Sequence, residues 1–440
     1  MSERWARAVL STYRWAGAAS FPFVGGYVAW RASRGMEDNA RRHERYGRAT
    51  AQRPAGPLIW VHAANDAETL AIVPLVSRLR ALGIGVVLTT GSVTSADIVG
   101  ERLNGSVIHQ YVPLDLKPAI ARFLDHWQPD LAIFAESEIW PMTVLELAAR
   151  RVPQVLVNGR MSDRAFASWR RRSSLAEALF ERFAKVVAQG DTDAERFVAL
   201  GARPVTVSGN LKTDVASPPV DELELKRVRN DIGERPRWSA LWTSAGEEKV
   251  AGEVHRLLMN RHPDVMTIVM PRDPRRADQI EAELTGMGLN VVRRSRKDRI
   301  TPKSHILIGD TARETGLYLR LADIAFLGGS LAGGGGQNPL EAAMLKVAIL
   351  SGQNIAYHSD LYAPLIANGG VRLLRDGEML AGAVNFLLRN DKARRDIGAA
   401  GAAAVETMRG ALDHTVRELG PFVQPLVVKA RLQDDAGRRR

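Results

Sequence analysis

A carboxylate at an expected strand-to-helix turn is the first candidate for chemistry in this chain. Glu68 follows the apolar run Leu58–Val61 and a six-residue link, and the apolar segment Leu70–Leu82 comes after it. If these runs are a strand and a helix, Glu68 stands at the carboxyl edge of a parallel sheet, where open α/β folds build their binding sites. There it could act as a general base on an incoming hydroxyl group. The alternative is structural, because an acidic residue in the first turn of a helix complements the helix dipole.

Two further carboxylates follow another apolar run. Glu136 and Glu138 come directly after Leu131–Ala135, in the sequence Glu-Ser-Glu-Ile-Trp-Pro. Carboxylates at the same sheet edge as Glu68 are costly unless they are paired or used in chemistry. Lys212 follows the last strand expected in this half, and it could hold Glu138 ionised or stabilise charge that develops during a transfer reaction. An ordinary structural salt bridge would explain the same pair.

The second half of the chain carries features suited to an anion. Pro271 and Arg272 end an apolar run, and an arginine at a strand end can bind a phosphate or a carboxylate. After a later apolar run, Ala312, Arg313 and Glu314 open a helix, and the first backbone amides of a helix can hold a phosphate. These features predict a phosphate-bearing ligand.

A run of four glycines, Gly333–Gly336, stands before a second candidate contact region. Glycines allow the backbone to come close to a ligand, and proline is favoured at the first position of a helix. A flexible loop is the simpler explanation of the glycines, but their position after an apolar run and before Asn-Pro-Leu-Glu favours a binding role. Glu341 could accept hydrogen bonds from ribose hydroxyls. The candidate ligand contacts here are Asn338, Pro339, Leu340 and Glu341.

Composition and motifs exclude several classes of protein. No Gly-Lys-Ser/Thr follows the glycines, so this is not a P-loop, and the link before Glu68 lacks the spaced glycines of a dinucleotide-binding dehydrogenase. The absence of cysteine excludes disulfides, thiolate chemistry and a cysteine-ligated metal. The formal charge of +11 favours an anionic partner. No nucleic-acid-binding module is visible, which leaves an acidic lipid surface or a phosphorylated substrate.

The elements that must position these residues alternate between short apolar runs and helical stretches, the signature of βαβ units. A polar stretch with Pro218 and Pro219 interrupts the pattern and reads as a linker. The sequence therefore predicts two Rossmann-like domains that face each other across a cleft. The expected strands are Leu58–Val61, Gly85–Thr89, Val107–Val112, Leu131–Ala135, Gln154–Val157, Lys185–Ala188 and Val205–Val207, then Ser239–Thr243, Thr267–Met270, Asn290–Val292, His305–Ile308, Ile324–Leu327, Ala348–Leu350 and Val371–Leu374.

The N-terminal region predicts membrane association. The segment Trp15–Trp30 carries no charge and is bracketed by Arg14 and Arg31. It is shorter than the roughly 20 apolar residues of a spanning helix and contains Pro22. Aromatic residues at its ends and middle suit a segment lying in the headgroup region, although a helical hairpin packed on the protein's own core is the alternative. The predicted organisation is a membrane-anchoring segment (1–48), a first domain (49–215), a second domain (216–425) and a basic, disordered tail (426–440).

Taken together, the motifs resemble those of the bacterial 3-deoxy-D-manno-octulosonic acid (Kdo) transferases of lipopolysaccharide synthesis. The resemblance extends from the N-terminal segment to about residue 389. No single block would suffice, but together they are far beyond chance. The blocks that carry it are Trp60-Val-His-Ala-Ala, Glu136-Ser-Glu-Ile-Trp-Pro, Asn158-Gly-Arg-Met-Ser, Gly209-Asn-Leu-Lys, Gly309-Asp-Thr, Gly316-Leu-Tyr and Gly335-Gly-Gln-Asn-Pro-Leu-Glu.

The resemblance implies the α/β GT-B fold, a place on the cytoplasmic side of the inner membrane, and transfer of Kdo from CMP-Kdo to a lipid A precursor. It implies no cofactor and no metal in the reaction. Carried onto this chain, it makes Glu68 the general base, and Glu138 and Lys212 supports of the transition state. The residues implied to bind CMP are Pro271, Arg272, Ala312, Arg313, Glu314, Asn338, Pro339, Leu340 and Glu341.

The chain departs from the family pattern at several loops. Where the family usually has Ser-Val-Gly before the base, this chain has Asn65-Asp66-Ala67, which adds a charge and a Cβ. Asp273 and Ser244 each replace a histidine, and Ala312-Arg313 replaces Met-Gly. Two alternatives therefore stand beside Kdo transfer. One is a diverged member with another donor or acceptor, or with little activity. The other is a non-catalytic membrane-surface protein that binds nucleotide or lipid.

Overall fold

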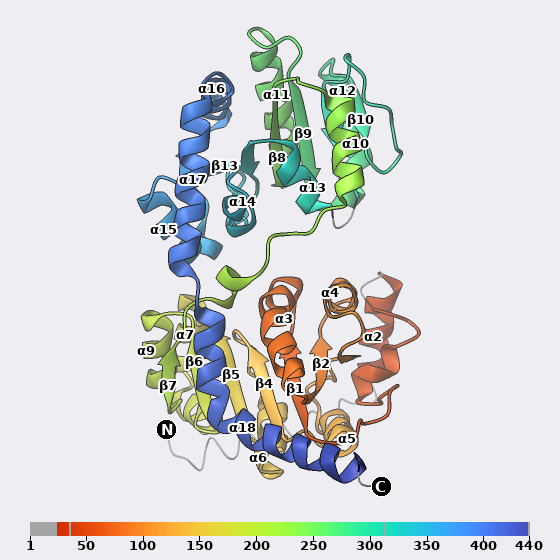
Figure 1. The fold of residues 1–440 in the computed structure, drawn as a ribbon, viewed down its shortest axis with the longest axis vertical. Helices are drawn as coiled ribbons and strands as arrows, with labels where there is room; N and C mark the ends of the chain where they lie inside the picture. The colour runs from red at the N-terminus through yellow and green to blue at the C-terminus, as the bar shows by residue number, and fades with distance from the viewer. Residues whose placement is uncertain (1–23, 35–36, 312–313, 439–440) are drawn as a thin grey trace. The chain divides into compact units, whose positions relative to one another are not determined.

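The computed structural model describes residues 24–34, 37–311 and 314–438, which form two α/β units (Figure 1). The first unit contains the residues up to Val215 together with those from Arg409 onward, and the second contains Ala216–Met408. Within the described residues each unit has one seven-stranded sheet, and all the strand pairs are parallel. The prediction of two parallel α/β domains is therefore confirmed.

The first sheet has the strand order β3-β2-β1-β4-β5-β6-β7. Its strands are β1 (Leu58–Ala63), β2 (Gly85–Thr90), β3 (Ile108–Tyr111), β4 (Leu131–Ala135), β5 (Gln154–Gly159), β6 (Lys185–Ala188) and β7 (Val205–Val207). Its helices are α2 (Val24–Ser33), η2 (Arg42–Tyr46), α3 (Asp66–Ala81), α4 (Val93–Leu103), α5 (Lys117–Trp127), α6 (Pro141–Ala149), α7 (Asp163–Arg170), α8 (Ser173–Phe180), α9 (Asp191–Ala199), η3 (Leu211–Asp214) and α18 (Ala411–Arg438).

The order of the strands sets the place of the first candidate site. The chain runs from β1 outward to β3 and then returns to place β4 on the other side of β1. The loops after β1 and β4 therefore diverge at the carboxyl edge, and such switch points are where open α/β sheets bind ligands. Glu68 follows β1, and Glu136 and Glu138 follow β4.

Both faces of this sheet are apolar, which is why its strands read as continuous hydrophobic runs. Ile59 and Val61 of β1 pack in one buried cluster, while Leu58 and Trp60 of the same strand pack in another on the opposite face. This alternation is what the two-residue period of a strand requires when helices cover both sides.

The C-terminal residues differ from the prediction of a domain that ends at 425 and a disordered tail beyond it. Residues 411–438 form α18, which belongs to the first unit and lies along its sheet (Figure 1). The reason is its apolar stripe: Leu419, Val423, Leu426 and Val427 are buried in the same cluster as Ile59. The basic residues at the chain end concealed this helix in the sequence.

The N-terminal boundary also differs from the predicted anchoring segment 1–48. Residues 37–48 pack on the first unit, since the Arg45 guanidinium donates to the carbonyl oxygens of Gly91 and Val112 and pairs with Glu37. Residues 1–23 lie outside the described part of the chain. Of the helices that are described, none combines the length and the apolar character needed to cross a membrane.

The second sheet has the strand order β10-β11-β9-β8-β12-β13-β14. Its strands are β8 (Arg237–Thr243), β9 (Met266–Pro271), β10 (Val291–Arg293), β11 (Ile306–Ile308), β12 (Ile324–Leu327), β13 (Ala348–Gly352) and β14 (Val371–Leu374). Its helices are α10 (Glu222–Ile232), α11 (Glu247–Met259), η4 (Pro274–Arg276), α12 (Ala277–Gly286), α13 (Thr315–Leu321), α14 (Leu340–Met344), η5 (Ala356–His358), α15 (Ser359–Ala367), α16 (Gly377–Arg389) and α17 (Asp391–Met408).

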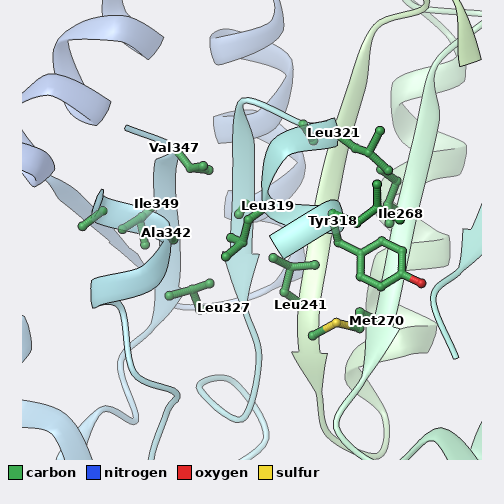
Figure 2. Close-up of a cluster of buried hydrophobic side chains, with 14 of the residues drawn as sticks. Leu241, Ile268, Met270, Tyr318, Leu319, Leu321, Leu327, Ala342, Val347 and Ile349 are labelled. Atoms are coloured by element: carbon green, nitrogen blue, oxygen red, sulfur yellow. The ribbon is translucent and has the colours of Figure 1, made fainter. Parts of the chain in front are cut away.

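The core of the second unit holds its candidate loops in place. Figure 2 shows side chains of α13 and α14 against those of β8, β9, β12 and β13. Tyr318 of α13 is fully buried, and its ring lies against Gly309, where an added Cβ would come within 2.5 Å of it. The switch in strand order falls between β8 and β12. The loops that follow those two strands therefore occupy the equivalent of the first candidate site.

Candidate active site

Glu68 is held by the backbone turn that joins β1 to α3. The Asn65 side chain caps α3 by accepting from the Glu68 N–H at 3.1 Å, and its own amide donates to Glu68 Oε1 at 2.6 Å. The Ala64 N–H donates to Glu68 Oε2 at 2.8 Å. The side chain is only 4% exposed. Glu68 therefore lies at the carboxyl edge of the sheet, as predicted. It is also part of the N-terminal cap of α3, so the structural explanation of this residue applies as well.

The surroundings of Glu68 favour its protonated form. Burial is the largest cause, and the nearby negative charges of Glu136 and Glu138 add to it, so that the pKa rises to about 8. The Ala64 N–H and the charge of Lys212 act in the opposite direction and are outweighed. A carboxylate with a pKa this close to physiological pH is a much stronger base than an ordinary glutamate.

Lys212 pairs with Glu136, which corrects the predicted pairing with Glu138. Its Nζ lies 2.5 Å from Glu136 Oε1, and both side chains are about nine-tenths buried. Glu136 has a left-handed backbone, with φ of 53°, and its N–H donates to Val157 O. This turn directs its side chain toward η3 and Asn158, whose Nδ2 donates to it at 3.3 Å. The left-handed backbone conformation of Glu136 could not be predicted from the sequence.

Glu138 instead lies beside an indole and an imidazole. The Trp140 Nε1–H donates to Glu138 Oε2 at 2.6 Å, and His62 Nε2 lies 3.7 Å from the same oxygen. His62 Nδ1 is 3.0 Å from the carbonyl oxygen of Thr89, and that oxygen can only accept, so Nδ1 carries the proton. His62 Nε2, which then carries no proton, faces Glu138 Oε2.

His62 is a site residue that sequence reasoning missed. It stands within the Trp-Val-His-Ala-Ala block, but a histidine inside an apolar strand is most simply a core residue. It is 1% exposed, and among the described residues its Nε2 has no hydrogen-bond partner. Only the fold brings it to Glu138, in the loop that follows β4.

The departures Asp66 and Ala67 are accommodated without disturbing Glu68. Asp66 Oδ1 accepts from the hydroxyls of Ser92, Thr94 and Ser95, which commits its charge to the start of α4. Ala67 lies inside α3, where a Cβ is favourable rather than costly. The turn needs no glycine at this position, contrary to the concern that the sequence raised.

In the second unit, Pro271 and Arg272 lie at the carboxyl end of β9 as predicted. Pro271 is buried, and Arg272 is exposed with its N–H donating to Thr243 O. Asp273 caps η4 and accepts from the Nε and Nη2 atoms of Arg275, each at 2.9 Å. Hydrogen bonds from Arg275 hold the pKa of Asp273 below its usual value. Its charge is therefore balanced locally.

Glu247 organises the loops at the second switch point, and sequence reasoning missed it. Its carboxylate accepts from the backbone N–H of Ser244 at 2.8 Å, just after β8. It also accepts from Gly329 at 2.6 Å and Ser330 at 3.1 Å, just after β12. A Cβ at Gly328 would lie 2.6 Å from Thr243 Cα, so the two loops are in close contact. One buried carboxylate thus fixes both loops.

The Asn-Pro-Leu-Glu block has a partly structural role. Asn338 Oδ1 accepts from the Leu340 N–H at 3.0 Å and starts α14, with Pro339 at its N-cap rather than at its first helical position. Leu340 is 1% exposed and belongs to the core, so its side chain is not available to a ligand. Glu341 is half-buried in the first turn of α14.

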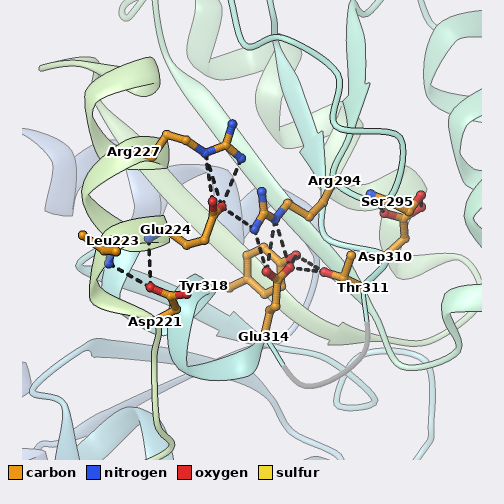
Figure 3. Close-up of polar contacts among 10 residues, drawn as sticks. All are labelled: Asp221, Leu223, Glu224, Arg227, Arg294, Ser295, Asp310, Thr311, Glu314 and Tyr318. Carbon is orange, nitrogen blue, oxygen red and sulfur yellow. Dashed lines mark hydrogen bonds and ion pairs between the residues drawn. The ribbon is translucent and has the colours of Figure 1, made fainter.

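Glu314 anchors a polar cluster rather than an open loop (Figure 3). Its carboxylate accepts from Arg294 at 2.6 Å, from the Tyr318 hydroxyl at 3.1 Å and from Thr311, and Arg294 also donates to Glu224 at 2.7 Å. Burial would raise the pKa of Glu314, but the Arg294 and Thr311 hydrogen bonds outweigh it and lower the pKa. The neighbouring candidates Ala312 and Arg313 lie outside the described residues.

Comparison with known proteins places this arrangement in one family. Residues 40–215 match the family model described as 3-deoxy-D-manno-octulosonic-acid transferase (kdotransferase). The chain is 33% identical to a probable mitochondrial 3-deoxy-D-manno-octulosonic acid transferase of Arabidopsis thaliana over 77% of this chain and 78% of that protein. It is also 33% identical to the 3-deoxy-D-manno-octulosonic acid transferase of Bordetella pertussis, over 85% of this chain and 90% of that protein.

The fold has relatives among solved structures. A glycosyltransferase from Rickettsia africae superposes with a TM-score of 0.57, at 12% identity, over 84% of this chain and 99% of that one. This likeness supports a GT-B-like fold and says nothing of the substrate. Sequence identity of 33% over most of both chains carries the assignment: the chain belongs to the 3-deoxy-D-manno-octulosonic acid transferase family.

Proposed function

We propose that this chain transfers Kdo from CMP-Kdo to the lipid A precursor lipid IVA, with inversion at the anomeric carbon and without a metal ion in the reaction. Family membership supports the transferred sugar, since the similar proteins of Arabidopsis thaliana and Bordetella pertussis carry that transferase name. The observation that carries the proposal is Glu68, a buried carboxylate at the first switch point with its pKa raised to about 8.

The transfer step requires one proton to be taken from the acceptor. As the acceptor hydroxyl oxygen bonds to the anomeric carbon of Kdo, its proton moves to Glu68. The bond between that carbon and the phosphate oxygen of CMP breaks, and the electron pair leaves with CMP. Burial and the like charges of Glu136 and Glu138 favour protonated Glu68, so the environment pulls the proton in the direction of reaction.

The neighbours of Glu68 have distinct roles in this proposal. Lys212, paired with Glu136 at 2.5 Å, supplies a fixed positive charge beside the base. It would stabilise the negative charge that accumulates during transfer. Glu138 is oriented by Trp140 and lies beside His62, and its negative charge acts on Glu68. These are positioning and electrostatic roles, while the proton transfer itself belongs to Glu68.

The second unit would hold the CMP group. Arg272 is an exposed cation at the end of β9, suited to the phosphate, and Pro271 fixes the strand end on which it stands. Glu341 and the backbone of Asn338, Pro339 and Leu340 would contact the nucleoside. Ala312 and Arg313 remain predicted contacts. The carboxylate of Glu314 is fully engaged by Arg294, so its contribution is to shape this loop.

The location follows from the substrate and the chain's N-terminal region. Lipid IVA is a membrane lipid, so we place the protein at the cytoplasmic face of the inner membrane, attached through its N-terminal region. Trp30 of α2 is 48% exposed, and the Arg34 guanidinium lies 4.5 Å from the centre of its ring. A tryptophan next to an arginine suits the lipid–water interface, which supports this attachment.

The test is a transfer assay with the purified full chain in detergent. CMP-Kdo is generated in situ, tetra-acylated lipid IVA is the acceptor, and the product is read by mass spectrometry. Addition of Kdo is expected. Glu68→Gln should reduce the rate by about 10²–10⁴-fold because the proton acceptor is lost, with CMP binding measured by calorimetry unchanged. Glu195→Gln removes an exposed carboxylate of the same unit and should leave the rate unchanged.

Three results would contradict the proposal. One is the absence of Kdo product from the folded protein while a known Kdo transferase is active under the same conditions. Another is a Glu68→Gln variant that loses CMP binding along with transfer, because that would make Glu68 a structural residue. A Kdo product formed at the wild-type rate by Glu68→Gln would remove Glu68 from the mechanism.

A further inference from the structure

A small basic pocket lies in the first unit, away from the residues described so far. It has a volume of about 330 Å³ and is lined by Arg42, His43, Tyr46, Arg48 and Arg122. The first four come from η2 and the turn after it, and Arg122 comes from α5. Among the residues that the structure describes, no carboxylate lines this pocket. It is called the basic pocket below.

The arginines of this pocket differ from their neighbours in the same segment. Arg41 and Arg45 point into the unit and are neutralised, Arg41 by Glu44 at 3.0 Å and Arg45 by Glu37 at 2.9 Å. The nearby carboxylates are thus committed to the inward arginines. The segment therefore separates two kinds of arginine: inward ones that hold it to the unit, and outward ones that line the pocket.

The outward arginines are available to a ligand. Arg42, Arg48 and Arg122 are exposed. Within the part of the chain that the structure describes, the Arg42 and Arg48 side chains make no hydrogen bond or ion pair. Clustered guanidinium groups without a carboxylate repel one another, so their presence in one pocket indicates an anionic ligand. Guanidinium groups bind phosphate oxygens bidentately.

The pocket is also rigid. Arg122 Nη1 donates to Tyr46 O at 2.5 Å, which fixes α5 to the end of η2. Gly47 then turns with φ of 76°, and a Cβ there would lie 2.0 Å from Ala119 O. Only glycine permits this approach, and it brings Arg48 to the same wall as Arg122. A preorganised site of this kind loses less entropy on binding.

The η2 segment, which supplies part of the pocket lining, is connected to the Glu68 turn. Arg45 donates to Gly91 O at 2.6 Å, the Gly91 N–H donates to Ala64 O at 3.1 Å, and the Ala64 N–H donates to Glu68. Three successive hydrogen bonds therefore link η2 to Glu68, the proposed general base.

We infer that the basic pocket binds a phosphate group carried by a membrane lipid. The shared chemistry is a phosphate, which could belong either to a phospholipid headgroup or to a phosphorylated saccharide lipid. The assignment rests on the basic pocket itself and holds whichever sugar the protein transfers. Its volume suits a phosphate with part of the adjoining glycerol or sugar.

The test compares two double variants of the full chain. R42Q/R48Q removes two cations that make no described side-chain contact, and R164Q/R171Q removes two exposed cations elsewhere in the same unit. Both are tested by co-sedimentation with phosphatidylcholine vesicles containing phosphatidic acid. R42Q/R48Q should weaken binding by about tenfold or more, since each cation near an anionic surface contributes substantially, and R164Q/R171Q by less than about twofold. Unchanged melting temperatures would show that both variants are folded.

A second probe separates phosphate recognition from general charge attraction. On vesicles in which oleic acid replaces phosphatidic acid at matched surface potential, the two variants should bind alike. Titration of glucosamine 1-phosphate then distinguishes the sources. If R42Q/R48Q loses binding of this compound, the ligand is a saccharide phosphate, and if it loses binding only on phosphatidic acid, the ligand is a phospholipid. Equal losses for both double variants on phosphatidic acid, no loss for R42Q/R48Q, or no binding of either phosphate probe by the wild type would overturn the inference.

Discussion

Glu68 combines a structural role with the chemical role proposed for it in one side chain. The same turn that uses it to complete the start of α3 also buries it beside two other carboxylates, and its pKa rises to about 8. The cap alone would be served by an ordinary ionised glutamate. Its raised pKa is what an efficient base requires, since the best catalytic pKa lies near the working pH. The structural explanation offered by the sequence is therefore confirmed, and the same residue has the raised pKa that the proposed role as general base needs.

The first prediction at this scale concerns the pH dependence of transfer. Only the deprotonated form of Glu68 can accept the acceptor's proton, so activity is lost as the pH falls through the pKa of about 8. Below that value kcat/KM should fall about tenfold per pH unit, and above it the rate should level off. A pH–rate profile of the wild type checks this, with Glu195→Gln as a matched control. A profile that is flat across this range would exclude Glu68 as the base.

The second prediction is that Glu68 lowers stability at alkaline pH. The folded protein binds this proton more tightly than the unfolded chain does, so between the ordinary value of 4.5 and about 8 stability decreases as the pH rises. Glu68→Gln cannot ionise. The melting temperature of this variant relative to wild type should therefore increase steadily from pH values below this window to values above it. A difference that is constant with pH would show that Glu68 ionises as freely in the folded protein as in the unfolded chain.

Some site residues could be predicted from the sequence and others could not. Glu68 and Arg272 stand directly beside strand ends, where the chain position alone indicates the sheet edge. The partner of Lys212 could not be predicted, because the choice between Glu136 and Glu138 depends on the left-handed turn at Glu136. His62 could not be found either, since its neighbours come from β2 and from the loop after β4.

At the scale of the elements, Glu247 determines the shape of the second switch point. It begins α11, yet its carboxylate holds the loops after β8 and β12 through their backbone amides. The strands themselves were predictable, because runs buried on both faces are continuous in the sequence. The conformation of the loops after β8 and β12 could not be predicted. Glu247 binds their backbone N–H groups, and every residue except proline has such a group, so the loop sequence does not reveal the contact.

The third prediction is that Glu247→Gln destabilises the second unit. A glutamine has one acceptor oxygen and places an N–H among buried backbone donors, so several of them lose their partner. The expected loss is about 2–4 kcal/mol of unfolding free energy, measured by urea denaturation, with weaker CMP binding by calorimetry. Glu253→Gln, an exposed substitution on the same helix, should change neither. If Glu247→Gln keeps the wild-type stability, the loops after β8 and β12 do not depend on the Glu247 carboxylate for their conformation.

At the scale of the whole molecule, the first unit is built from both ends of the chain. β1 to β7 come from the first half, but α18, from the last residues, covers one face of their sheet. The sequence predicted the two domains from their alternating pattern and missed this return. The apolar positions of α18 follow a helical period, but they stand among charged residues and two prolines. The sequence of this segment therefore looks much like that of a solvated tail.

The fourth prediction tests this return. Leu419→Ala removes a side chain that is 1% exposed among residues of the first sheet, and it should cost about 2–5 kcal/mol of unfolding free energy. Leu432→Ala, on the same helix but 65% exposed, should cost little. Urea denaturation followed by tryptophan fluorescence measures both. Similar stability of the two variants would mean that α18 does not contribute to the core of the first unit.

The placement of α18 has a consequence for the order in which the protein is made. Domains usually fold in the order in which they leave the ribosome. Here the nascent chain has all seven strands of the first sheet by Val207 but lacks the helix that covers one face until residues after 411 emerge. The second unit, continuous from Ala216 to Met408, is complete before the first. The first unit, which carries Glu68, is therefore finished last, after the whole second unit has already been synthesised.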